Sequence, residues 1–330
     1  MLGRVSIPTK AEILLTRGCN LQCSYCSMVQ YKSLGASEWK ARNELSDEQW
    51  GQVPAKLAEL DIPFAAIYGA EPLTRLPALL SFISNATFPC TVITNGLLLD
   101  KKPIKALSSA GLKSITLSDD IISSDKQVTT KSSRARRLLA DCLEVFEDVE
   151  LIVTLTPQNL PLLVDYIMSM PKGVYVHFDF QHHDRGQEGS KCSGETPAFQ
   201  TIHAELIRDS MKSVLLLKQQ GCRVHPSEKV LRELVKNPLL ALNLNWKCEA
   251  GAWVTVNSDG DVYGCDDYQP NSFRGRNILD YSEKWSWSDW VKEWGVALKK
   301  CPGCFWITHA MAVDFSRSQD KEWHHELTHK

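Results

Sequence analysis

Three cysteines lie close together near the start of the chain, in the run Gly-Cys-Asn-Leu-Gln-Cys-Ser-Tyr-Cys. They are Cys19, Cys23 and Cys26, and their spacing is C-x3-C-x2-C. Three thiolates on one loop can hold three irons of a cubane [4Fe–4S] cluster and leave the fourth iron without a protein ligand. That open iron can bind and activate a small molecule. A zinc loop or a set of buried thiols is the alternative, and a C-x2-C pair alone would leave it strong.

The x3-x2 spacing, with Tyr25 just before the last cysteine, favours the cluster and resembles the signature of the radical S-adenosylmethionine (radical SAM) enzymes. The resemblance implies that SAM binds the open iron and is split by one electron into methionine and a 5′-deoxyadenosyl radical. That radical would remove a hydrogen atom from a substrate carbon, with the protein providing position and exclusion of water. A one-electron reductant such as flavodoxin or ferredoxin is implied as a partner.

A second motif, Tyr68-Gly69-Ala70-Glu71-Pro72, follows the second predicted strand. It resembles the Gly-Gly-Glu-Pro motif of the family, whose backbone and acid hold the methionine ammonium of SAM. The carboxylate of Glu71 is a natural partner for an ammonium group. Gly69 permits close approach of the backbone to a ligand. Ala70 replaces the second glycine of the family and adds one methyl group to the loop.

Further motifs at the ends of predicted strands are similar to those at the corresponding places in the family. Each one alone is an ordinary turn. Their order on consecutive strands favours a shared site, because the carboxyl ends of parallel strands meet at one end of a barrel. Together with the Gly69–Pro72 loop, the predicted SAM contacts are Tyr25, Thr94, Asn95, Ser118, Asp119 and Thr156.

Four cysteines in the last third of the chain predict a second centre. Cys248 and Cys265, with Gly260 between them, form C-x11-G-x4-C, which resembles the opening of SPASM and twitch domains, and Cys301 and Cys304 supply a closing pair. Since no cysteine follows Cys304, we expect a shortened, twitch-like domain with one auxiliary [4Fe–4S] cluster. Structural zinc is the alternative. A fully ligated cluster would accept an electron from a substrate radical.

Candidate residues on the substrate side lie after the sixth predicted strand. The loop Gln181-His182-His183-Asp184-Arg185 offers His183 as a base and Arg185 as a clamp for a carboxylate or phosphate. Cys192, in a Gly- and Ser-rich stretch, is a candidate donor of a hydrogen atom or proton. A solvated loop and an incidental cysteine are the alternatives. Three other cysteines are expected to be core or surface thiols: Cys90, Cys142 and Cys222.

These residues need a scaffold that brings strand ends together. Six short apolar runs alternate with amphipathic segments, which predicts an α/β fold with a partial (β/α)6 parallel barrel, because a closed barrel needs eight strands. The predicted strands are 11–15, 64–68, 90–94, 114–117, 151–155 and 174–180. The predicted helices are 47–60, opened by a capping box of Ser46 and Gln49, then 76–84, 101–110, 134–146 and 160–170.

The composition changes after about residue 230. Eight of the ten tryptophans lie between Trp246 and Trp323, where a hairpin of 254–256 with 262–263 and a helix over 286–298 are also predicted. We therefore expect a radical SAM barrel over residues 1–230 and a small Cys-rich α+β domain over residues 231–315. The last residues, 316–330, are expected to form a tail.

Composition narrows the class of protein further. With 330 residues and 43% apolar content the chain can bury a full core, and a net charge of −2 gives no electrostatic case for nucleic acid or an anionic membrane. Neither a signal peptide nor an apolar stretch long enough to span a bilayer is present in the sequence. Eleven cysteines without a secretory signal predict metal ligation in a reducing compartment, the cytoplasm.

The sequence thus predicts a radical SAM oxidoreductase. The favoured reaction is two-electron dehydrogenation of a small natural-product or carbohydrate-like metabolite, with the auxiliary cluster as electron acceptor. The first alternative is a peptide-modifying enzyme that forms a cross-link or an oxidised side chain; such relatives often carry an N-terminal leader-binding domain, whereas the first strand here is predicted from residue 11. The second alternative is a non-catalytic iron–sulfur or zinc scaffold.

Overall fold

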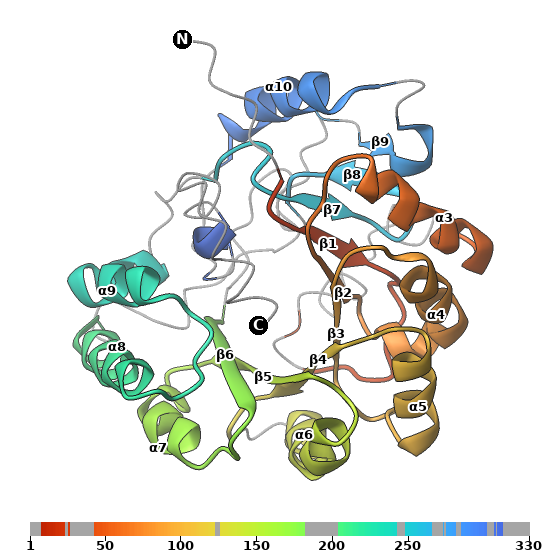
Figure 1. Ribbon diagram of the computed structural model, residues 1–330. Helices are drawn as coiled ribbons and strands as arrows, with labels where there is room; N and C mark the ends of the chain where they lie inside the picture. The colour runs from red at the N-terminus through yellow and green to blue at the C-terminus, as the bar shows by residue number, and fades with distance from the viewer. Residues whose placement is uncertain are drawn as a thin grey trace.

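The computed structural model describes residues 8–23, 26, 43–122, 126–181, 204–242, 248–265, 273, 275–281, 285–301, 307 and 309–312. In this part of the chain a nine-stranded sheet runs in the order β6-β5-β4-β3-β2-β1-β7-β8-β9 (Figure 1). Its first six members are all parallel, as predicted for a partial barrel. They are β1 (Ala11–Leu14), β2 (Ala65–Tyr68), β3 (Cys90–Thr94), β4 (Ser114–Asp119), β5 (Asp148–Leu155) and β6 (Val174–Phe180).

The helices lie on the outer side of the curved array of strands (Figure 1). They are α3 (Asp47–Ala58), α4 (Leu76–Asn85), α5 (Lys101–Ser109), α6 (Lys126–Leu143), α7 (Leu163–Met168), α8 (Ala204–Gln219), α9 (Glu228–Lys236) and α10 (Trp287–Leu298). Short 3-10 turns are η1 (Pro72–Arg75), η2 (Leu160–Leu162), η4 (Pro238–Leu242) and η5 (Ile278–Asp280). None of the described helices is long and apolar enough to cross a membrane.

Side-chain caps mark the start of four of these helices, α3, α5, α9 and α10. The predicted capping box opens α3: the Ser46 hydroxyl accepts the Gln49 N–H at 3.2 Å, and Gln49 Oε1 accepts the Ser46 N–H at 2.8 Å. Helix α6 begins eight residues before its predicted start. The polar segment 126–133 lacks apolar periodicity, but tertiary packing buries Val128 and Lys131 of this turn.

Each barrel strand has an apolar face toward the helices. On β4 and β5 these residues are Leu117, Leu151 and Val153, all with no exposed surface. They join the side chains of the surrounding helices in one hydrophobic core. Because side chains alternate along a strand, the residues between them point into the barrel.

The inner face of the barrel is polar. Thr91 and Thr116 hydroxyls lie 3.2 Å apart on β3 and β4, and Thr116 donates to Glu150 on β5 at 2.9 Å. Glu150 in turn lies 3.3 Å from His177 Nδ1 on β6. The predicted runs of buried apolar residues therefore describe one face of these strands, whereas the other face carries a chain of hydrogen bonds.

The C-terminal strands extend the barrel sheet. Strand β7 (Val254–Val256) pairs in parallel with β1, and β8 (Asp261–Tyr263) and β9 (Arg276–Asn277) follow antiparallel. The predicted hairpin is present, and its Gly260 has φ of +85°, which favours glycine. The predicted domain boundary at residues 230 and 231 lies inside α9.

Tryptophans of α10 pack this helix against the hairpin. Trp290 and Trp294 are buried, and Trp290 Nε1 donates to the Val262 carbonyl at 3.4 Å. A Cβ on Gly264 would lie 2.1 Å from Trp294 Nε1, so a glycine is required for this close contact. These two tryptophans therefore form part of the core of the C-terminal region.

A short C-terminal segment lies inside the barrel, seen in dark blue in Figure 1. The Ile307 N–H donates to both carboxylate oxygens of Asp179 on β6, at 3.2 and 3.1 Å. His309 Nε2 lies 3.5 Å from Glu12 Oε1 on β1, and its ring stacks on Trp253 with centroids 4.2 Å apart. Burial opposes ionisation of Glu12, but Lys10 and His309 outweigh it and hold the pKa of this carboxyl well below its usual range. The segment thus joins β6 to β1 across the open side of the barrel.

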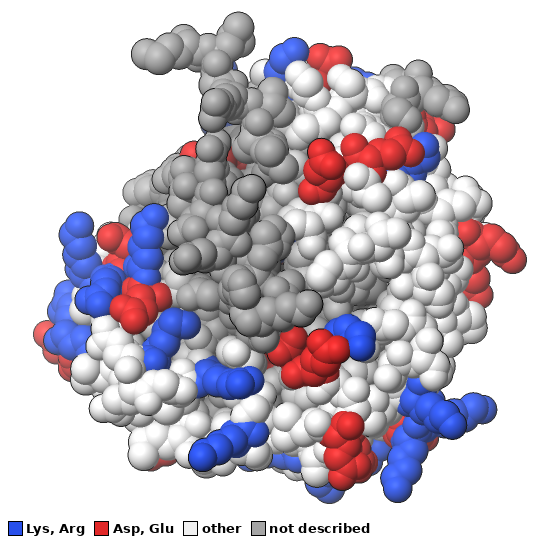
Figure 2. Space-filling model, in the orientation of Figure 1, with Lys and Arg blue, Asp and Glu red and all other residues white. Residues whose placement is uncertain are grey.

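Charges on the face shown in Figure 2 are mixed in sign, with basic and acidic side chains side by side over α8 and α9. One such pair is Arg232 with Glu228, 2.9 Å apart. This mixture agrees with the small net charge of the chain.

Candidate functional site

The loop that carries the cysteine triplet begins where β1 ends. Cys23 is buried, Cys19 and Cys26 are half-buried, and the Cys26 N–H donates to the Cys23 carbonyl at 3.0 Å. The Leu21 N–H points at Cys19 Sγ, 3.3 Å away. None of the nine described cysteines forms a disulfide.

The Gly69–Pro72 loop is bound directly to this cysteine loop through the backbone. The Ala70 N–H donates to the Thr16 carbonyl at 2.9 Å, and the Glu71 N–H donates to the Gly18 carbonyl at 2.8 Å. A Cβ on Gly69 would lie 2.8 Å from the Thr16 carbonyl oxygen. Gly69 therefore permits close approach to the backbone that follows β1. Ala70 does not have a positive φ, so its methyl group causes no backbone strain.

The carboxylate of Glu71 joins the end of β2 to the end of β3. It accepts hydrogen bonds from the Thr94 hydroxyl at 2.7 Å, the Asn95 N–H at 2.8 Å and the Leu73 N–H at 3.1 Å. Only 1% of this residue is exposed. Burial raises the pKa of Glu71, and the three hydrogen bonds oppose that rise.

Asn95 extends the connection from β3 to the cysteine loop. Its Nδ2 donates to Asn20 Oδ1 at 2.9 Å and points at Cys19 Sγ, 4.0 Å away. Its Oδ1 accepts the Leu97 N–H at 2.9 Å, which fixes the amide orientation. The predicted residues Glu71, Thr94 and Asn95 are thus brought together, and Asn95 connects them to Cys19.

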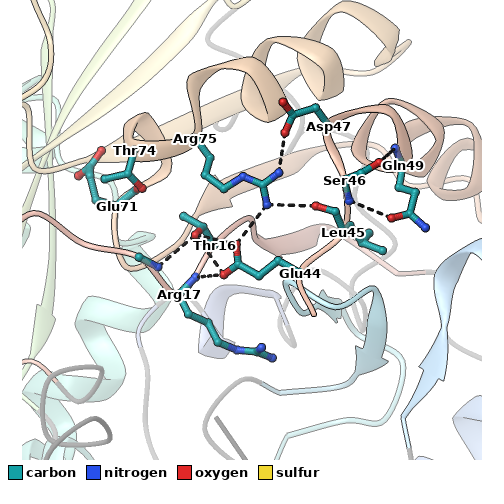
Figure 3. A network of polar contacts seen from close by, with 11 residues as sticks. Thr16, Arg17, Glu44, Leu45, Ser46, Asp47, Gln49, Glu71, Thr74 and Arg75 are labelled. Atoms are coloured by element: carbon teal, nitrogen blue, oxygen red, sulfur yellow. Dashed lines mark hydrogen bonds and ion pairs between the residues drawn. The ribbon is translucent and has the colours of Figure 1, made fainter. Parts of the chain in front are cut away.

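A network around Glu44 supports the same region and was not predicted from the sequence (Figure 3). Glu44 accepts the Arg17 N–H at 2.7 Å and the Thr16 hydroxyl at 3.0 and 3.1 Å. Arg75 of η1 reaches Glu44 at 3.1 Å and Asp47 at 2.5 Å. The network therefore fixes the end of β1, the start of α3 and the turn after Glu71. Neither a motif nor a periodic pattern marks Glu44 in the sequence.

Ser118 and Asp119 end β4 but face opposite sides of the sheet. Asp119 has no exposed surface and lies on the helix side, where it pairs with Arg136 and accepts from Tyr166 at 2.9 Å. Two contacts from Arg136, one from Tyr166 and one from the Ile121 N–H fill the four acceptor positions of the Asp119 carboxylate. Ser118, one residue earlier, lies on the barrel side.

Thr156 lies in a turn at the end of β5. The Asn159 side chain accepts the Thr156 N–H at 2.7 Å, and its Nδ2 donates to the carbonyls of Thr154 and Asp120 at 2.9 and 3.0 Å. Asn159 is fully buried. This asparagine therefore joins the ends of β4 and β5, as Glu71 joins those of β2 and β3.

Three of the four C-terminal cysteines are described. Cys265 follows β8 and is buried, Cys301 follows α10 and is half-buried, and half-buried Cys248 packs beside Ala252 and Trp253. The remaining predicted site residues lie outside the described residues: Tyr25, His183, Arg185, Cys192 and Cys304. Burial raises the pKa of Cys90 and Cys142 to about 12, which fits the core thiols predicted for these positions.

The triplet fits a cluster with three protein ligands. Three thiols lie within eight residues on one loop, and N–H groups of Leu21 and Asn95 point at Cys19 Sγ. Hydrogen bonds of this kind stabilise thiolates that hold iron–sulfur clusters. The loop therefore offers both the ligand atoms and the surrounding donors that such a cluster requires.

Sequence comparison gives two relatives of similar length. The chain is 29% identical over 274 residues to the probable GTP 3′,8-cyclase of Methanopyrus kandleri, covering 77% of this chain and 80% of that protein. It is 25% identical over 338 residues to the Fe-coproporphyrin III synthase of Methanosarcina barkeri, covering 89% and 79% respectively.

Structural comparison shows the same fold in a solved protein. Streptococcus suis SuiB bound to S-adenosylmethionine matches with a TM-score of 0.63 at 15% identity, covering 92% of this chain and 74% of that one. Residues 13–158, from β1 to the turn after β5, match the family model described as the radical SAM superfamily. This stretch contains the cysteine triplet and the strand ends that surround it, and we conclude that the chain carries a radical SAM superfamily domain.

Proposed function

We propose that this protein is a radical SAM oxidoreductase that removes a hydrogen atom from a small metabolite and oxidises it by two electrons. One observation carries the core of this proposal. The cysteine loop and the Gly69–Pro72 loop are held together by two backbone hydrogen bonds, from Ala70 to Thr16 and from Glu71 to Gly18. A ligand of the open iron would therefore lie beside the Gly69–Pro72 loop.

Cys19, Cys23 and Cys26 would hold the [4Fe–4S] cluster. When bound, this group supplies the electron that splits SAM and so provides the radical that removes the hydrogen atom. The protein contributes position: Glu44 fixes the start of the loop through Thr16 and Arg17, and Asn95 fixes its first cysteine. We expect a flavodoxin or ferredoxin to act as the reductant.

The methionine ammonium of SAM would be bound by the Gly69–Pro72 loop. Three of about four acceptor positions of the Glu71 carboxylate are already used, which leaves one for an ammonium group. Ser118, on the barrel side of β4, remains the candidate for contact with the ribose or the methionine carboxylate. Asp119 is not favoured for that role because its acceptor positions are filled on the helix side.

A second cluster would be held by Cys248, Cys265, Cys301 and Cys304, and it would provide a one-electron acceptor for an oxidised substrate. The sequence spacing of these residues supports this assignment. The region is attached to the barrel, because β7 pairs with β1 and Arg17 Nη2 lies 3.2 Å from Asp259 Oδ2. That attachment would give the second centre a fixed position relative to the first.

Two relatives support a small molecule as substrate. They are the probable GTP 3′,8-cyclase and the Fe-coproporphyrin III synthase, and the chain covers about four-fifths of each. Both names refer to small molecules. Other matches act on or bind peptides and support the peptide-modifying alternative: the chain covers 56% of a PqqA peptide cyclase of Granulibacter bethesdensis and 87% of anSMEcpe with bound AdoMet and Kp18Cys peptide, the latter with a TM-score of 0.58 at 18% identity. His183, Arg185 and Cys192 remain the candidates for contact with the substrate.

Loss of the triplet should abolish cleavage of SAM. In an anaerobic assay with dithionite, Cys19→Ala, Cys23→Ala and Cys26→Ala should each form no 5′-deoxyadenosine, because two thiolates cannot retain the site-open cluster. Cys222→Ala, a half-buried thiol outside the site, is the control and should retain activity. Sustained 5′-deoxyadenosine formation by the triplet variants would exclude this mechanism.

The second centre makes a separate prediction about metal content. Two cubane clusters give about eight irons per chain, and Cys265→Ala should lower this to about four while uncoupled SAM cleavage continues. Iron, sulfide and zinc are measured on the same samples. A wild-type protein with about four irons and bound zinc would rule out the auxiliary iron–sulfur cluster.

Thr94→Val should weaken SAM binding without removing the cluster. Valine has the shape of threonine but cannot donate to Glu71, so the Gly69–Pro72 loop loses one of its buried supports. We expect an affinity loss of about tenfold, equivalent to about 1.4 kcal/mol. Thr94→Ser keeps the hydroxyl and should bind SAM as the wild type does. Equal affinities of Thr94→Val and wild type, at equal iron content, would contradict this role for Glu71.

The substrate class can be tested without knowing the substrate. An extract of cells grown in deuterated medium is divided by a filter that retains precursor peptides, and each fraction is incubated with enzyme, SAM and reductant. Deuterium should enter 5′-deoxyadenosine with the small-molecule fraction, because the hydrogen atom comes from the substrate. Deuterium transfer confined to the retained fraction would favour the peptide-modifying alternative.

A further inference from the structure

Two histidines and a carboxylate meet inside the barrel, away from the cysteine loop. Glu150 lies on β5, His177 on β6, and His225 in the segment between α8 and α9. One potential ligand atom of each lies within 4.8 Å of the others. Glu150 is five residues before the end of β5, so it lies about 16 Å along the strand from the barrel end that carries the SAM loops.

The three side chains converge on one oxygen atom. His177 Nδ1 lies 3.3 Å from Glu150 Oε1, and His225 Nδ1 contacts the same oxygen. The two imidazole rings are nearly perpendicular, with centroids 5.3 Å apart. Ligand atoms that lie within 4.8 Å of one another can be drawn onto one zinc ion, whose bonds to nitrogen and oxygen are about 2.0–2.1 Å.

The site is shielded from solvent. The exposed fractions of the side chains are 8% for His177, 12% for His225 and 13% for Glu150. Burial opposes ionisation of Glu150, but His225 and His177 outweigh it and hold its pKa well below the usual range. His177 Nε2 is buried and has no hydrogen-bond partner among the described residues. One of the two nitrogen atoms of this ring is therefore left without a hydrogen bond in the described part of the chain.

Surrounding contacts hold the three residues in position. Thr116 donates to Glu150 Oε2 at 2.9 Å, which leaves Oε1 directed at the histidines. The His225 N–H donates to the Val176 carbonyl at 3.0 Å, and the Val176 N–H donates to the Arg223 carbonyl at 2.9 Å. Residue His225 is thereby paired with the edge of β6 by main-chain bonds. Such supporting bonds orient metal ligands in known sites.

We propose that Glu150, His177 and His225 bind a divalent transition-metal ion, with Zn²⁺ as the best match, inside the barrel. Imidazole nitrogen and carboxylate oxygen are ligands that zinc prefers, and a water molecule would complete the tetrahedron. The ion would connect β5, β6 and the segment after α8, and so stabilise the edge of the parallel sheet. This site is independent of the cysteine centres and of the proposed reaction.

The test measures zinc and its ligands in the full-length protein. The chain is reconstituted with iron and sulfide anaerobically, incubated with Zn²⁺ and dialysed against a weak chelator. We expect about one zinc per chain to be retained, with a first shell of nitrogen and oxygen at about 2.0–2.1 Å in X-ray absorption. Zinc at the cysteines would instead give sulfur at about 2.3 Å, so the two locations are distinguishable.

Variants separate this site from other histidines. His177→Gln should lose the retained zinc at unchanged iron content, whereas His309→Gln, which alters a buried histidine beside Glu12, should keep it. Added Zn²⁺ should raise the melting temperature of wild type but not of His177→Gln, because only a bound ion stabilises the folded state. Absence of retained zinc in wild type, a sulfur-dominated shell, or equal retention by His177→Gln would overturn the proposal.

Discussion

The buried residue Glu71 holds the ends of β1, β2 and β3 together. It accepts hydrogen bonds from Thr94, Asn95 and Leu73, and its own N–H is bound to the Gly18 carbonyl. These bonds join the ends of β1, β2 and β3 at a point with almost no exposed surface. A buried carboxylate is costly unless its acceptor positions are filled, so three strand ends must come together before this residue is satisfied. The cysteine loop and the Gly69–Pro72 loop are joined through this same residue.

The polar inner face of the barrel is a second constraint. A parallel barrel of eight strands fills its interior with apolar layers, but here six parallel strands leave one side open. Three acidic residues line this interior, and each has a partner. Glu12 pairs with Lys10 and His309, and Glu150 pairs with His177 and His225. Asp179 accepts the Ile307 N–H. Because these groups need partners, the C-terminal segment is held inside the barrel. The need of these buried polar groups for hydrogen-bond and ion-pair partners, as well as hydrophobic burial, therefore determines how the chain covers the open side of the barrel.

The C-terminal third is attached to the cysteine loop at several points. Strand β7 pairs with β1, the Leu45 N–H donates to the Ser258 carbonyl at 2.7 Å, and Arg17 forms a buried ion pair with Asp259. Figure 3 shows Glu44 beside Thr16 and Arg17, which lie at the start of the cysteine loop. A shift of the hairpin would therefore be transmitted to residues next to Cys19.

Periodicity in the sequence was sufficient to predict the six parallel strands, most helix positions and the hairpin. Motif spacing was sufficient to find the cysteine triplet and the Gly69–Pro72 loop. Each of these features is encoded within a few neighbouring residues. Tertiary structure alone decided the rest. Glu44, Arg75 and Asn20 support the site through contacts between distant segments, so no local pattern marks them. The side of β4 on which Asp119 lies, and the meeting of Glu150 with His177 and His225, depend on strand register and on the path of the chain after α8. Register and chain path are set by packing of the whole sheet, which a single sequence does not display.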